Sequence, residues 1–152
     1  MFDTEHDIYQ HFASCIVKAI PNPNWETAYL TVAISGNATQ QVCGYFTANN
    51  PKDFDYDIDD GADMDAQVME AALSLRNIHR ARENSDAFNK FKFTLHNDGT
   101  FNVEFKYDTD FKYAESLNGD SQEYSDLLAY NVIDSIESWE GLPKDHPRPW
   151  LH

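Results

Sequence analysis

The sequence contains little of what metal sites, disulfide frameworks and membrane anchors are built from. Only Cys15 and Cys43 are present among 152 residues, with no C-x-x-C and no Cys/His spacing typical of zinc sites. Both lie in apolar surroundings, so we expect two buried free thiols in a reducing, cytoplasmic setting, with one disulfide between them as the alternative. No apolar run approaches the ~18 residues of a membrane span. The acidic first residues lack the basic and apolar regions of a signal peptide.

Motifs of common enzymes and nucleotide-binding proteins are missing as well. The chain has no G-x-S-x-G, no P-loop and no G-x-G-x-x-G. Its six histidines do not pair at the spacing of metal ligands. We therefore expect no catalytic residues, no metal and no cofactor.

Positive charge is scarce, and negative charge is concentrated in parts of the chain. Eleven Lys and Arg stand against 26 Asp and Glu, for a formal net charge of −15. The first 65 residues carry eleven acids and two bases, whereas residues 76–112 carry seven bases and six acids. Concentrated negative charge repels nucleic acid and speeds the encounter with basic partners, although it destabilises a compact state. We therefore predict a basic protein partner and neither a nucleic acid nor a membrane.

The densest charge lies between Asp53 and Asp65, a stretch called the acidic segment below, in which seven of thirteen residues are aspartate. Asp55, Asp57 and Asp59 match the start of an EF-hand loop, but Asp60 stands where that loop needs glycine. The twelfth position, which requires glutamate, is alanine, so we do not expect an EF-hand. A solvated loop that caps the following helix, or weak cation binding, are alternatives to a surface that faces a protein partner.

In the protein-facing interpretation, Phe54, Tyr56 and Ile58 serve as apolar anchors between the charges, because interfaces favour buried aromatic anchors with charges at the rim. A second acidic face is expected on the last predicted helix. The predicted partner-binding residues are Asp53, Asp55, Tyr56, Asp57, Asp59, Asp60 and Asp63 in the acidic segment, and Asp126, Asp134 and Glu137 in that helix.

Hydrophobic periodicity predicts an α+β fold in a single domain, residues 1–152, with regular structure over about 4–140 and a Pro-rich tail over 141–152. The order α-β-β-α-β-β-α predicts an antiparallel sheet of about four strands with three helices on one face. The acidic segment before about residue 62 and residues 108–120 are predicted to be irregular. The expected helices span 4–20, about 62–82 and 121–139, and the expected strands span 26–35, 41–48 and two arms within 90–107.

The arms within 90–107 form a hairpin whose register the sequence predicts. A two-residue loop would place Leu95 opposite Asn102, which pairs a core side chain with a solvent one. A three-residue loop, Asn97 to Gly99, instead pairs Leu95 with Phe101 on the apolar face, and Lys92 with Glu104 on the other face. It also pairs Phe93 with Val103 and Phe91 with Phe105. We predict the three-residue loop with Gly99 in the left-handed region.

The three tryptophans lie before and after the hairpin in the sequence. Trp139 and the apolar face of the hairpin are predicted to be core. Trp25 is predicted to close the first helix against the sheet. Trp150 lies in the tail HPRPWLH and is either buried or exposed for binding, because the sequence does not decide between the two.

The hairpin run F-x-F-x-L-x-N-D-G-x-F-x-V-x-F-x-Y-D, Phe91 to Asp108, resembles the YezG-like immunity-protein family. Similar features are a Pro-rich break and Trp25 before the first strand, the acidic segment before a long helix, and Trp139-Glu140 at the last helix. The resemblance implies a small acidic protein that neutralises a nuclease toxin of a bacterial polymorphic toxin system. It implies no catalytic residues.

The residues and the resemblance lead to the same hypothesis. Nucleases bind phosphate and therefore have basic clefts, which an acidic protein can occupy or flank. We predict an immunity protein, not an enzyme, that binds a cognate toxin domain through its acidic surface. The alternative is an acidic scaffold or adaptor that binds a basic cellular protein.

Overall fold

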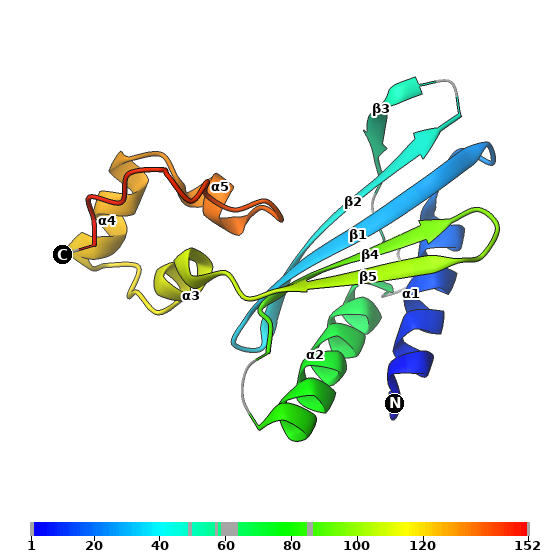
Figure 1. The fold of residues 1–152 in the computed structure, drawn as a ribbon, viewed down its shortest axis with the longest axis horizontal. Helices are drawn as coiled ribbons and strands as arrows, with labels where there is room; N and C mark the ends of the chain where they lie inside the picture. Colours follow the sequence, from blue (N-terminus) through cyan, green and yellow to red (C-terminus); the bar gives the residue numbers. More distant parts are fainter. Residues whose placement is uncertain (1, 49, 57, 59–63, 85–86, 152) are drawn as a thin grey trace.

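The structure, a computed structural model, describes residues 2–48, 50–56, 58, 64–84 and 87–151, with residues 50–55 described by their backbone. An antiparallel sheet of order β3-β2-β1-β4-β5 forms its centre (Figure 1). The elements are α1 (Glu5–Ala19), β1 (Trp25–Ser35), β2 (Ala38–Thr47), β3 (Asn50–Asp55), α2 (Met64–Glu83), β4 (Lys90–His96), β5 (Phe101–Lys106), α3 (Thr109–Glu115), α4 (Gln122–Ala129) and α5 (Ile133–Glu137).

Helices α1 and α2 pack side by side against one face of the sheet (Figure 1). Thr4 begins α1 because its hydroxyl accepts a hydrogen bond from the Asp7 amide at 3.1 Å. Glu5 joins the two helices: its carboxylate accepts from the Tyr9 hydroxyl at 2.8 Å and lies 2.7 Å from the Arg82 guanidinium. Burial raises the pKa of Glu5, but these two partners outweigh burial and hold the pKa below its usual value.

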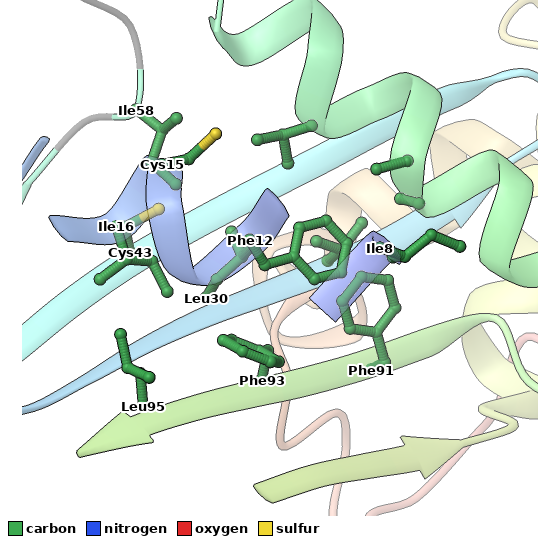
Figure 2. Packing of buried hydrophobic residues seen from close by; sticks show 14 of the residues in the cluster. Ile8, Phe12, Cys15, Ile16, Leu30, Cys43, Ile58, Phe91, Phe93 and Leu95 are labelled. Atoms are coloured by element: carbon green, nitrogen blue, oxygen red, sulfur yellow. The ribbon is translucent and has the colours of Figure 1, made fainter. Parts of the chain in front are cut away.

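The main core lies between these helices and the sheet. Phe12 of α1 stacks on Phe91 and meets Phe93 edge-on, at 5.5 and 5.6 Å between ring centroids (Figure 2). Cys15 and Cys43 are both buried and neither is in a disulfide, as predicted. The alternating side chains of β1 send Leu30, Val32 and Ile34 into this core.

The hairpin of β4 and β5 has the predicted register. Leu95 pairs with Phe101, Phe93 with Val103, Phe91 with Phe105, and Lys92 with Glu104. Gly99 has φ +93°, a conformation that favours glycine. The prediction of a buried apolar face is wrong for β5, however, because Phe101 and Phe105 are 45% and 38% exposed. β5 lies at one edge of the sheet, so it has a neighbouring strand on one side only, and its side chains are less covered than those of an inner strand.

The C-terminal part differs most from the expectation. Residues 108–120, predicted to be irregular, contain α3, which Asp108 begins by accepting from the Phe111 amide at 3.1 Å. The single helix expected over 121–139 is divided into α4 and α5, because Asn131 adopts a left-handed φ of 57° between them. Figure 1 shows these three helices beyond one end of the sheet. They enclose a second apolar cluster of Ala33, Phe111, Leu127, Val132, Ile136 and Trp150.

The α+β class and the element order are confirmed, with five helices and five strands in the described residues instead of three and about four. The added strand, β3, begins the acidic segment. Its residues Phe54 and Asp55 pair with Tyr45 and Gly44 of β2, so that part of the segment is not irregular. Trp139 is half-buried outside the main core and carries the Lys106 ammonium 4.3 Å above its ring. Trp25 packs partly buried against the core, as predicted.

Candidate partner-binding surface

The acidic segment is fixed to the protein by its apolar residues. Tyr56 and Ile58 are only 6% and 4% exposed, and Met64 is buried where α2 begins. The Tyr56 hydroxyl donates to the Tyr29 carbonyl at 3.2 Å, and burial raises the pKa of Tyr56. Ile58 belongs to the same buried apolar cluster as Cys15, and Figure 2 draws both among its side chains. These side chains anchor the segment inward and do not present themselves to a partner, contrary to the expectation for Tyr56.

The predicted acidic residues of the segment fall in two groups. Asp53 and Asp55 lie on β3, the edge strand next to β2, where Asp55 is registered opposite Gly44. The others, Asp57, Asp59, Asp60 and Asp63, lie outside the described residues. Their role in binding stays a prediction.

The second acidic group is not on one helix. Asp126 lies on α4, where its carboxylate accepts from Gln122 at 2.9 Å, whereas Asp134 and Glu137 lie on α5. Asp134 is exposed. Glu137 accepts a hydrogen bond from the Gln40 side chain on β2 at 3.0 Å. The break at Asn131 therefore directs Glu137 toward the sheet.

Glu137 lines a cleft that sequence reasoning missed. This cleft, called the helix–turn cleft below, has a volume of about 220 Å³ and lies between the β1–β2 turn and helices α3, α4 and α5. Glu115 is a second acid in its lining, at the end of α3, and is paired with Lys112 at 2.8 Å. The lining includes Ala38, Phe111, Ala114, Glu115, Ile133 and Glu137. One residue in the sequence pointed to part of this cleft, because Asp108 is suited to cap the N-terminus of a helix and α3 begins after it.

Lys90 fixes the helical wall of this cleft to the sheet. Its side chain is 1% exposed, and its ammonium donates to the Asp108 carboxylate at 2.6 Å. It also donates to the backbone carbonyls of Ile136 at 2.7 Å and Ser138 at 2.6 Å, so all three N–H groups have acceptors. Burial lowers the pKa of Lys90, and the neighbouring Asp108 opposes that effect.

The tail is packed against the same helices. Arg148 forms two parallel hydrogen bonds to the Asp110 carboxylate, at 2.8 and 2.9 Å. Trp150 is 4% exposed and lies 5.6 Å from the Tyr130 ring, which resolves the alternative left open by the sequence. The C-terminal helices are thus held at Lys90 and at Arg148.

Two other kinds of site are absent from the described ranges. There, no group of three or more His, Cys, Asp or Glu side chains is placed to hold a metal ion. None of the helices described is both long and apolar enough to cross a membrane.

The fold defines a small α+β protein with a five-stranded antiparallel sheet and a cleft lined by two glutamates. The chain belongs to the YezG-like family of immunity proteins, because the family model described as "Immunity protein YezG-like" matches residues 6–136. Membership gives the chain an immunity role, with a cognate toxin as its partner. A search of curated proteins finds no match.

Proposed function

We propose that this immunity protein neutralises a nuclease toxin domain in the cytoplasm by binding it through an acidic surface, without catalysis. The observation that carries the proposal is the concentration of aspartate in one segment, two of whose residues, Tyr56 and Ile58, are buried in the core. A nuclease cleft is basic because it binds phosphate. An acidic segment on a folded frame has the complementary charge.

The buried anchors matter because they reduce the conformational entropy that the segment loses when it binds a partner. Tyr56 and Ile58 are buried on the same stretch of chain as the aspartates, so the segment is tethered at intervals before a partner arrives. Ordering a segment upon binding costs affinity, and pre-ordering avoids that cost. Negative charge then steers a basic toxin to the site, which increases the association rate. Fast capture suits a protein whose partner is lethal while free.

The experiment has a cellular arm and a kinetic arm. The toxin domain encoded beside this gene is expressed alone and together with this protein, and survival is measured. An inactive form of that toxin domain is then used to measure association rates from low to high salt. Co-expression is expected to restore growth, and association is expected to slow as salt rises.

The acidic segment is tested by replacing four of its aspartates together with asparagine, at Asp55, Asp57, Asp59 and Asp60. We expect the association rate at low salt to fall by about tenfold or more, with a weaker salt dependence. A matched control makes the same change of charge at four exposed acids elsewhere, Asp3, Glu26, Glu104 and Asp120. Equal rates for the two variants and the wild type contradict the role of the segment. A toxin that still kills despite co-expression contradicts the proposed function.

A further inference from the structure

The helix–turn cleft combines an apolar wall with two carboxylates. Phe111 and Ala114 of α3 and Ile133 of α5 supply the apolar part. Glu115 and Glu137 supply the charge, and the lining contains no lysine, arginine or histidine. The cleft therefore suits a group that is aliphatic along its length and positively charged at its end.

Arginine and lysine side chains have this composition. Both bury an aliphatic stem along apolar surface and place the charged end among polar groups. Glu115 and Glu137 each have one described partner, Lys112 and Gln40 respectively. A carboxylate offers about four acceptor positions, so each retains capacity for further donors. Arginine adds the option of two parallel hydrogen bonds to one carboxylate.

The walls of the cleft come from elements that are held together independently of any partner. Lys90 ties the carbonyl of Ile136 in α5, and Asp108 at the start of α3, to strand β4. Gln40 of β2 ties Glu137 to the opposite wall. A pocket preformed in this way loses little entropy when a side chain enters it.

We propose that the helix–turn cleft receives one arginine or lysine side chain of the toxin domain, which places its cationic end between Glu115 and Glu137. The inference rests on the proposed function, since it names a contact within the same complex. The stem lies against Phe111, Ala114 and Ile133. A side chain held in a cleft by charge and apolar contact dissociates slowly, so this contact lowers the dissociation rate, whereas the acidic segment governs the association rate.

The first test removes the charge of the cleft without changing its shape. The double variant Glu115→Gln with Glu137→Gln is compared with a control, Glu123→Gln with Glu140→Gln, which removes two charges from exposed residues outside the cleft lining and outside the predicted binding residues. Binding to the inactive toxin domain is measured by surface plasmon resonance. We expect Kd to rise by about tenfold or more for the cleft variant, mainly through faster dissociation, and much less for the control.

The second test fills the cleft. Ala38, at its rim, is changed to tryptophan, and Ala81→Trp on the exposed face of α2 serves as the control for a bulky addition. Thermal unfolding verifies that each variant is folded. Ala38→Trp is expected to weaken binding by about tenfold or more, and Ala81→Trp is expected to bind like the wild type.

The outcomes separate the two proposals. Folded cleft variants that bind the toxin domain with wild-type Kd overturn this inference and leave the proposed function standing. A wild-type protein that neither binds nor neutralises the toxin overturns both. Coupling between Glu137 and one Lys or Arg of the toxin domain in a double-mutant cycle supports the contact directly.

Discussion

Replacing Lys90 with methionine tests how the C-terminal helices are held. Methionine keeps much of the length and apolar character of the lysine stem, but not the ammonium that lies 5.4 Å from the centroid of the Phe111 ring. It removes the ammonium that serves Asp108 and the carbonyls of Ile136 and Ser138. The Asp108 side chain is only 9% exposed, so its carboxylate loses its buried counter-charge. Removing one member of a buried ion pair costs about 3–5 kcal/mol, and we expect a loss of about 4 kcal/mol.

The matched control is the same substitution at Lys112. That side chain is 51% exposed and pairs with Glu115 three residues along the same helix. Such surface pairs contribute less than about 0.5 kcal/mol. The two variants thus remove the same charge from two ion pairs of similar distance, 2.6 and 2.8 Å, that differ in burial.

The assay is urea unfolding followed by circular dichroism, combined with hydrogen exchange. A loss of about 4 kcal/mol corresponds to a fall in Tm of about 8–16 °C for a domain of this size. Amides of α4 and α5 in Lys90→Met are expected to exchange faster, relative to the wild type, than those of α1 and α2, because local opening follows the lost contacts. If Lys90→Met unfolds at the same urea concentration as Lys112→Met, the reasoning from burial is refuted.

Two further predictions concern Glu5 on helix α1 and Gly44 on strand β2. The pKa of Glu5 is held below the value of 4.5 that it has when unperturbed, so its stabilising effect is present above pH 4.5 and is lost as pH falls through the lowered folded value. Glu5→Gln should therefore be less stable than the wild type at pH 7, by up to about 1 kcal/mol, with the gap closing between pH 5 and 3 in urea titrations. A gap that widens toward acid contradicts this. Gly44 lies under the Tyr29 ring, where an added Cβ would come within 2.4 Å of ring atoms, so Gly44→Ala should cost about 1–3 kcal/mol. The loss should shrink when Tyr29→Ala is added, and equal losses in both backgrounds would show that the ring is not the cause.

The hairpin shows what local pattern can establish. The alternation from Phe91 to Tyr107, together with Asp98-Gly99, allows few registers, and only the three-residue loop places apolar residues opposite apolar ones. That argument concerns which residues face each other. The register does not determine which strand lies at the edge of the sheet, so the exposure of Phe101 and Phe105 could not be predicted from it.

Strand β3 and the anchoring of the acidic segment were within reach of the sequence and were missed. Phe54, Tyr56 and Ile58 alternate with aspartates, which is the period of a half-buried strand. The high charge favoured an irregular, solvated interpretation instead. Burial of Tyr56 and Ile58 shows that the period carried the correct signal.

The helix–turn cleft depends on contacts between distant positions. Lys90 stands on the polar face of its strand, and alternation alone predicts that it is solvated. Its acceptors come from residues 108, 136 and 138, and the positions of the last two follow from the break at Asn131. An asparagine inside an otherwise continuous helical pattern is only a weak sequence signal of a helix break. The position of Glu115 and Glu137 in the same cleft could therefore not be predicted from the sequence.

The position of β3 at the margin of the sheet has a consequence for how such a protein can diversify. A substitution in a central strand disturbs hydrogen-bonded neighbours on both sides, whereas β3 has a single neighbour, β2. Substitutions in β3 are thus expected to cost less folding free energy than substitutions in the inner strands, provided that Tyr56 and Ile58 keep their buried places. One scaffold can in this way change its binding specificity to a different toxin while its core stays unchanged.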